Sequence, residues 1–195
     1  MRICVFCGSS SGHDPAYADG AAAAARAIAL TGTTLIYGGG RIGLMGVVAE
    51  AALGAGGEVV GVMPRSLVER EIAHRGLHQL HVVETMHERK TIMSALSDAY
   101  LALPGGAGTL EEIFEQWTWG QLGIHGKPCG FLDLKGYFDP IRLMVERMVS
   151  EGFLLPHFAR MLRFSGSIDE VLDGFRSYVP PPGKWTSAAD NAVRP

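Results

Sequence analysis

The chain has 195 residues, of which 47% are hydrophobic and 19% charged, enough for one domain with a sizeable core. A formal net charge of −3 and a pI near 6.1 argue against a nucleic-acid or membrane surface and favour a small-molecule partner. The longest apolar runs have the length of strands, and the three cysteines do not form a secreted-type framework, so we expect a cytoplasmic protein.

Apolar segments of strand length alternate with segments of helical pattern along the chain. Strands are expected at residues 2–8, 33–38, 58–63, 77–84, 99–104 and 128–133, and helices at 14–30, 42–53, 86–97, 110–122, 137–151 and 168–178. This alternation predicts an α/β sandwich of three layers, in which helices cover both faces of a mostly parallel sheet. We expect one domain over residues 1–178 and, because prolines follow, an extended or disordered tail over 179–195.

Cys4 and Cys7 form a CxxC motif within the first predicted strand. Such a motif can mark a thioredoxin-like redox site. Residues three apart on a strand point to opposite faces, however, about 10 Å apart along the chain. We therefore expect two buried strand cysteines and no redox pair.

Four connections that follow predicted strands carry unusual residues, at 7–12, 37–46, 84–90 and 104–112. In an open parallel sheet, the connections at the carboxyl ends of the strands share one edge, where ligands bind. Glycine-rich turns before a helix expose N–H groups that suit a phosphate. Any one of these turns can also be no more than a tight strand-to-helix connection.

Gly38, Gly40 and Gly43 satisfy the G-x-G-x-x-G pattern of dinucleotide-binding folds. The next strand should then end in an acid that binds the ribose, but it ends in "VMPR", with Glu58 at its start. The chain also has no room for a separate substrate domain. These features argue against a nicotinamide-dependent dehydrogenase.

Thr85 and Glu88 have the spacing of a capping box, which places Arg89 and Lys90 in the first turn of a helix. Cations are disfavoured at that end of a helix. We therefore expect an anion or an acidic partner beside them, with a solvated pair on an exposed face as the alternative.

Thr109 and Glu112 repeat the capping-box spacing after the glycines at 105, 106 and 108. In one interpretation, Glu112 only caps its own helix. In the other, it is an ionised carboxylate beside a phosphate loop, where it stabilises a developing cation or orients a water. Spacing alone does not separate the two.

The segment "HRGLHQLH" offers His74, His78 and His81 as potential metal ligands. Gly76 interrupts any helix that would align the first two, and neither cysteines nor acids complete a zinc pattern. We expect no metal site.

Four segments together carry a resemblance to a known family. "PGGAGTLEE" matches the signature PGGxGTxxE, and "CVFCGSSSG", "YGGGRIGLMG" and "MHERK" precede it in the expected order. Over residues 1 to about 178, the chain resembles the Lonely Guy family of cytokinin riboside 5′-monophosphate phosphoribohydrolases, often labelled lysine decarboxylase-like. The resemblance implies a Rossmann-like homodimer that needs no cofactor and hydrolyses a nucleoside 5′-monophosphate to free base and ribose 5-phosphate.

The resemblance also assigns residues. Arg89 and Glu112 match the proposed catalytic pair, and the variable motif position is Ala107. The positions that match substrate contacts, together with those of the glycine loops, are Gly8, Ser9, Gly39, Glu71, Met86, Lys90, Gly105, Gly106, Gly108, Thr109 and Thr118.

The predicted chemistry agrees with these residue types. Breaking a ribosyl C–N bond builds positive charge on the sugar. Glu112 would face this cation and hold the water, Arg89 would orient Glu112 or the ligand, and the glycine loop would hold the phosphate. The base and the physiological substrate stay open, because base specificity depends on the shape of the pocket.

Two other functions are alternatives to this one. A pyridoxal-dependent decarboxylase needs a lysine Schiff base and a partner for the ring nitrogen, and the chain shows no segment built for them. A non-catalytic carrier of a phosphorylated ligand, such as the molybdenum cofactor, would use the same scaffold. The presence of both Glu112 and Arg89 favours the enzyme.

Overall fold

The computed structural model describes residues 1–70 and 72–184. Its strands are β1 (Arg2–Phe6), β2 (Thr34–Tyr37), β3 (Val59–Pro64), β4 (Gln79–Val83), β5 (Ala99–Ala102), β6 (Cys129–Leu132) and β7 (Leu162–Ser165). Its helices are α1 (Pro15–Leu30), α2 (Gly43–Gly54), α3 (Arg65–Val68), α4 (Met86–Leu96), α5 (Ala107–Gln121), the 3-10 turn η1 (Leu134–Gly136), α6 (Asp139–Ser150), α7 (Pro156–Ala159) and α8 (Ile168–Arg176). These elements confirm the predicted alternation of strands and helices.

The strands form one sheet in the order β4-β3-β2-β1-β5-β6-β7, and all six pairings are parallel. Strands β2, β3 and β4 are added on one side of β1, and β5, β6 and β7 on its other side. The direction of the strand order therefore reverses between β1 and β5. This reversal point is where open α/β sheets bind ligands. The strand order therefore places the connections after β1, β2 and β5 around one crevice.

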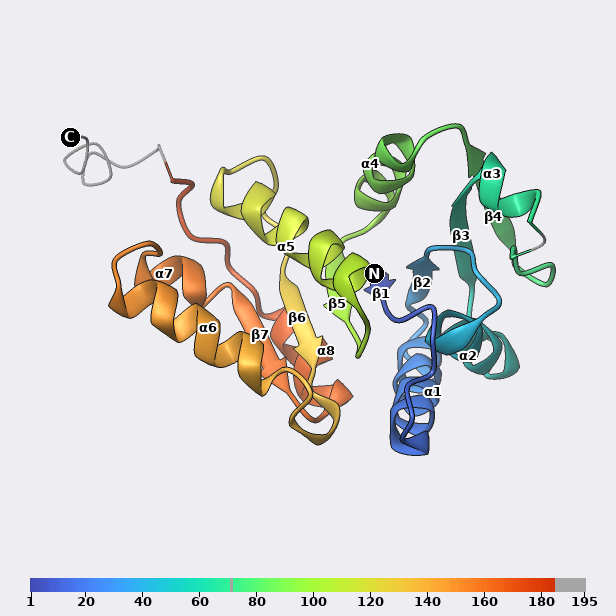
Figure 1. The fold of residues 1–195 in the computed structure, drawn as a ribbon, viewed down its shortest axis with the longest axis horizontal. Helices are drawn as coiled ribbons and strands as arrows, with labels where there is room; N and C mark the ends of the chain where they lie inside the picture. Colours follow the sequence, from blue (N-terminus) through green and yellow to red (C-terminus); the bar gives the residue numbers. More distant parts are fainter. Residues whose placement is uncertain (71, 185–195) are drawn as a thin grey trace.

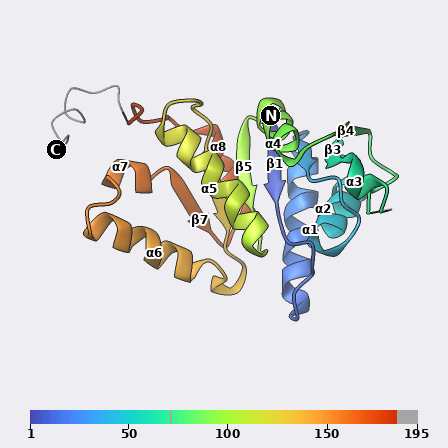
Figure 2. The same ribbon diagram turned by 45° about the horizontal axis from the view of Figure 1, so that its top comes forward.

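Helices cover both faces of the sheet, which gives the predicted three layers (Figure 1). Side chains of α1, α2 and α8 share an apolar core on one face, and those of α4, α5, α6 and α7 share a second core on the other. Figure 2 shows the same arrangement from a second direction, with α4 and α5 next to each other above the middle of the sheet.

Residues of β1 alternate between the two cores, as the period of a strand requires. Ile3 and Val5 pack toward α1 and α2, whereas Cys4 and Phe6 pack toward α4 and α5. Cys7 belongs to the first core and Cys4 to the second, so the two thiols lie on opposite faces, as predicted. Burial raises the pKa of both thiols, which keeps them protonated and unreactive.

Four short elements were not predicted: α3, η1, α7 and the edge strand β7. Strand β7 has only four residues and exposes Arg163, so its sequence lacks the apolar run that identifies the inner strands. It nevertheless pairs with β6 and completes the sheet.

The predicted tail lies partly outside the described residues. Residues 179–184 follow α8 without helix or strand, and the Lys184 N–H donates to the Gln121 carbonyl at 2.7 Å, at the end of α5. Residues 185–195 are not described. Within the described ranges, the helices are all too short or too polar to cross a membrane.

Candidate active site

Three glycine-containing connections pack tightly together at the carboxyl edge of the sheet. The Gly8 N–H donates to the Pro104 carbonyl at 3.0 Å, which joins the connection after β1 to the one after β5. Gly43 has a φ of +57°, and a Cβ there would overlap the backbone of Ser9. Only glycine therefore allows the connection after β2 to approach the same loop.

Helix α5 begins three residues earlier than the sequence predicted. Gly106 is its N-cap and makes no side-chain capping bond, while Thr109 lies inside the first turn and is buried. Of the two interpretations that the spacing left open, the structure therefore does not show Thr109 and Glu112 as a capping box. The first N–H groups of a helix have no partner within the helix, so those of α5 remain available to an anion.

Arg89 and Glu112 form a nearly buried ion pair beside this helix end. Arg89 Nη1 lies 3.3 Å from Glu112 Oε1, and their side chains are only 11% and 13% exposed. Arg89 Nε also donates to the Val62 carbonyl at 3.1 Å. A Cβ at Gly38 would overlap Arg89 Nη2, so this glycine gives the guanidinium the space that it occupies.

The carboxyl group of Glu112 is poised between two opposing influences. Burial raises its pKa above the ordinary value for a glutamate, and the neighbouring Arg89 guanidinium partly opposes that rise. Lys90 also lowers this pKa, whereas Glu111 and Glu115 raise it. A carboxyl group whose pKa is perturbed in this way, at the ligand edge of an α/β sheet, is a candidate for catalysis.

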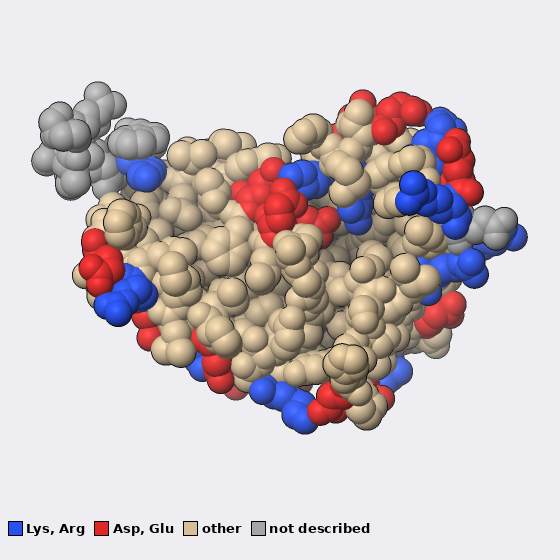
Figure 3. Space-filling view, viewed as in Figure 1, with Lys and Arg blue, Asp and Glu red and all other residues tan. Residues whose placement is uncertain are grey.

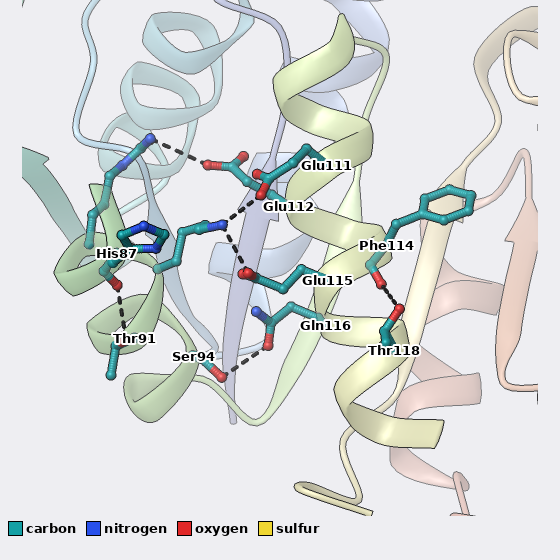
Figure 4. A network of polar contacts seen from close by, with 11 residues as sticks. His87, Thr91, Ser94, Glu111, Glu112, Phe114, Glu115, Gln116 and Thr118 are labelled. Atoms are coloured by element: carbon teal, nitrogen blue, oxygen red, sulfur yellow. Dashed lines mark hydrogen bonds and ion pairs between the residues drawn. The ribbon is translucent and has the colours of Figure 1, made fainter. Parts of the chain in front are cut away.

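Lys90 joins helices α4 and α5 next to this pair. Its Nζ lies 2.6 Å from Glu111 Oε1 and 2.9 Å from Glu115 Oε1. Figure 4 shows Glu111, Glu112 and Glu115 on the side of α5 that faces α4, and Figure 3 shows acidic and basic groups gathered there at the surface. The expectation of an acidic partner beside Arg89 and Lys90 is thereby confirmed. The predicted capping box of Thr85 and Glu88 is also confirmed.

The structure brings most of the predicted substrate-contact residues to this edge. Gly8, Ser9, Gly105 and Gly106 line a cavity of about 300 Å³ beside the N-terminus of α5. Thr109 lies so close to Gly105 that a Cβ at Gly105 would overlap Thr109 Oγ1. Gly108 is exposed in the first turn of α5.

Three other predicted contacts have different surroundings. Gly39 has a φ of +76° in the buried connection after β2. Met86 is 46% exposed, and its Sδ accepts a weak bond from Arg89 Nη1 at 3.9 Å. Thr118 is exposed on the side of α5 away from Glu112, where its Oγ1 donates to the Phe114 carbonyl (Figure 4). Glu71 lies outside the described residues.

The histidines have structural contacts instead of a shared centre. His74 Nε2 lies 2.9 Å from Glu50 Oε1, and its Nδ1 accepts the Gly76 N–H. His78 Nδ1 accepts the Val59 N–H at 3.3 Å. Among the residues that the structure describes, no group of three or more histidines, cysteines and acids is placed to hold a metal.

Sequence reasoning missed three residues of this edge. Glu111 and Glu115 stand one residue before and three after Glu112, a spacing that puts them on the same side of a helix. Tyr137, after β6, donates from its hydroxyl to the Gly105 carbonyl at 2.6 Å. The position of Tyr137 in the sequence could have identified it, because the connection after β6 also starts at the carboxyl edge of the sheet, where ligands bind.

The chain is similar to known proteins over nearly its whole length. The family model described as "Possible lysine decarboxylase" matches residues 45–175. The probable cytokinin riboside 5′-monophosphate phosphoribohydrolase LOGL3 of Oryza sativa subsp. japonica is 44% identical over 92% of this chain and 85% of its own. An Arabidopsis thaliana protein named cytokinin riboside 5′-monophosphate phosphoribohydrolase is 42% identical over 92% of this chain and 84% of its own.

Solved structures show the same fold at lower identity. The molybdenum cofactor binding protein of Rippkaea orientalis has a TM-score of 0.67 at 21% identity, covering 90% of this chain and 95% of its own. The Moco carrier protein of Chlamydomonas reinhardtii has a TM-score of 0.67 at 18% sequence identity, and the match covers 90% of this chain and 94% of the carrier. Fold is thus shared with carriers, whereas sequence identity above 40% is shared with the phosphoribohydrolases. The chain belongs to the family of the cytokinin riboside 5′-monophosphate phosphoribohydrolases.

Proposed function

We propose that this protein hydrolyses the N-glycosidic bond of a nucleoside 5′-monophosphate, such as a cytokinin riboside 5′-monophosphate or AMP, to free base and ribose 5-phosphate. One observation carries the proposal: a nearly buried Arg89–Glu112 pair lies beside a helix end that has no side-chain cap. Its relatives of more than 40% identity carry this activity in their names.

In this proposal, the first turn of α5 and its glycine loop hold the 5′-phosphate. Three features suit an anion there: the uncapped N–H groups, the positive end of the helix dipole and the glycine at position 106. Binding energy from the phosphate then fixes the sugar against Glu112, five residues further along the helix than Ala107.

Glu112 acts on the sugar as the C–N bond breaks. The transition state resembles an oxocarbenium ion, and an ionised carboxylate in a nearly buried site stabilises that charge strongly. The same carboxylate can orient the water that attacks the anomeric carbon. Arg89 holds Glu112 in place and favours its ionised form, because the guanidinium lowers the pKa that burial raises.

The test is to incubate the purified protein with AMP and with isopentenyladenosine monophosphate, and to follow free base and ribose 5-phosphate by chromatography. Replacing Glu112 with Gln should lower kcat by about 100-fold or more while the nucleotide still binds. Glu146→Gln, the same change at an exposed position on α6, is the matched control and should keep full activity.

The outcomes separate the two functions. Base release that survives Glu112→Gln would refute the role of this carboxylate. Binding of a phosphorylated ligand without any turnover would favour the carrier, whose fold this chain shares. The ratio of the rates with the two nucleotides would identify the preferred base.

We also infer a homodimer in the cytoplasm. Thr118 matches a substrate contact of the family but points away from Glu112 on its own chain, so it would serve the site of a second copy. Exposed apolar side chains at the end of α5, Leu122 and Ile124, offer surface for such contact. The three free, buried cysteines suit a reducing compartment. Light scattering should give twice the chain mass of 20.9 kDa.

A further inference from the structure

We propose that Tyr137 is a positioning residue of the phosphate site, which fixes the Gly105–Gly106 peptide in the orientation that receives the anion. This inference rests on the proposed function. The Tyr137 hydroxyl donates to the Gly105 carbonyl oxygen at 2.6 Å, from a segment that lies 32 residues further along the chain. Tyr137 also lines the cavity of about 300 Å³ that Gly105, Gly106 and Ser9 border.

The hydrogen bond fixes both ends of one peptide unit. In a trans peptide, the carbonyl and the following N–H point in opposite directions, and the backbone has no cis bonds among the described residues. Holding the Gly105 carbonyl toward Tyr137 therefore turns the Gly106 N–H away from the tyrosine. Glycine has the widest conformational freedom of any residue, so without this bond the Gly105–Gly106 peptide could rotate.

The bond also changes the electrostatics of the cavity. A carbonyl oxygen carries partial negative charge, and Gly105 stands beside the site where we expect a phosphate. A free carbonyl there would repel the anion. The tyrosine O–H occupies that oxygen and reduces the repulsion, which a phenylalanine at the same position would not do.

Tyr137 is itself held firmly. Its ring packs edge-on against Tyr17 at 5.6 Å between centroids and against Phe138 at 5.0 Å. The turn before it places Lys135 at a φ of 59°, a left-handed conformation that costs a non-glycine residue about 1 kcal/mol. The Lys135 ammonium forms an ion pair with Asp14, the N-cap of α1. These contacts place the partly exposed ring of Tyr137 beside Gly105.

Binding measurements on Tyr137→Phe test this role. The variant keeps the ring and its edge-on contacts and removes only the donor. Calorimetry should show AMP and inorganic phosphate binding about three- to tenfold more weakly than to the wild type, as expected for one lost hydrogen bond. Affinity for adenosine, which lacks the phosphate, should not change.

Tyr178→Phe is the matched control, because it removes another hydroxyl at the other edge of the sheet. Within the described part of the chain, the Tyr178 hydroxyl is buried without a hydrogen-bond partner, and Tyr178 lines a cavity with Pro128 and Cys129 at the start of β6. This variant should bind AMP, phosphate and adenosine like the wild type. Melting temperatures of both variants check that each is folded.

Three results would overturn the role of Tyr137: phosphate affinity unchanged in Tyr137→Phe, an equal loss for phosphate and adenosine, or a wild type that binds neither AMP nor phosphate. These binding measurements do not require turnover. A wild type that binds AMP and releases no base would refute the proposed hydrolase and leave the result for Tyr137 readable.

Discussion

Replacing Arg89 with methionine should destabilise the protein in a way that depends on pH. Arg89 Nη1 and Glu112 Oε1 lie 3.3 Å apart with little exposure of either side chain. At an effective dielectric constant of about 20, Coulomb's law gives this pair about 5 kcal/mol. Removing one partner of a buried pair typically costs about 3 to 5 kcal/mol, because the other charge is left without compensation.

The sign of the pH dependence follows from linkage. Burial already raises the pKa of Glu112, and loss of Arg89 removes the largest influence that lowers it. In the variant, the folded state therefore holds the Glu112 proton more tightly than the unfolded chain does. Stability is then fully present below the unfolded pKa of a glutamate and falls as the pH rises through the folded value.

At low pH, the protonated carboxyl needs no counter-ion. The remaining cost of Arg89→Met is then the hydrogen bond from Arg89 Nε to the Val62 carbonyl, about 1 kcal/mol. Between about pH 4 and about pH 8, we expect the variant to lose roughly 2 to 4 kcal/mol more than the wild type loses.

Urea unfolding at these two pH values measures the effect, at one fixed protein concentration because a dimer would make stability depend on it. The double variant Arg89→Met with Glu112→Gln removes the buried charge, so it should recover most of the loss near pH 8. If Arg89→Met loses the same free energy at both pH values, or if Glu112→Gln does not rescue it, the pair is not the coupled buried unit described here.

Two further substitutions probe the same edge. Gly105→Ala should raise the KM for the nucleotide more than tenfold and destabilise the fold by about 1 to 3 kcal/mol, because its Cβ would overlap Thr109 Oγ1 and lie 2.8 Å from the Gly8 backbone nitrogen. Gly106→Ala is the control for the melting temperature, because a Cβ there meets no described atom within 4 Å. Equal melting temperatures for the two variants would contradict the packing argument. Lys90→Met should move the acid limb of the kcat profile to higher pH, because Lys90 lowers the pKa of Glu112. An unmoved or lowered limb would exclude that influence.

Much of the fold could be predicted because its inner strands are nearly all apolar. Strands such as β1 and β5 are buried on both faces, so their sequences are continuous hydrophobic runs between glycine turns. Strand β7 lies at the edge with Arg163 exposed, and the short helices α3 and α7 have four residues each. Segments of this length carry too little periodicity to identify them.

The sequence predicted which segments lie at the same edge of the sheet, but not which of their side chains contact one another. Parallel topology placed the connections after β1, β2 and β5 at one edge, and the first-turn position of Arg89 and Lys90 indicated an acidic partner. Which acidic side chains of α5 reach Arg89 and Lys90 depends on the residue at which α5 begins. The spacing allowed Thr109 to be the N-cap of α5. In the structure, Thr109 instead packs against Gly105, and Glu112 forms an ion pair with Arg89. Tertiary contacts decided between two local arrangements that the sequence left equal.

The distribution of charge along α5 suits the transition state better than the substrate. At its start, N–H groups without a side-chain cap and the helix dipole give positive potential, where we propose that the phosphate binds. Further along the helix, Glu111, Glu112 and Glu115 form ion pairs with two cations, Arg89 and Lys90. Among the described residues, Glu115 Oε2 is buried without a hydrogen-bond partner. The phosphate is negative throughout the reaction, but the sugar becomes positive only as the C–N bond breaks. In the proposed complex, with the phosphate at the start of α5 and the sugar against Glu112, this excess of negative charge would stabilise the transition state more than the bound nucleotide, which is the condition for faster catalysis.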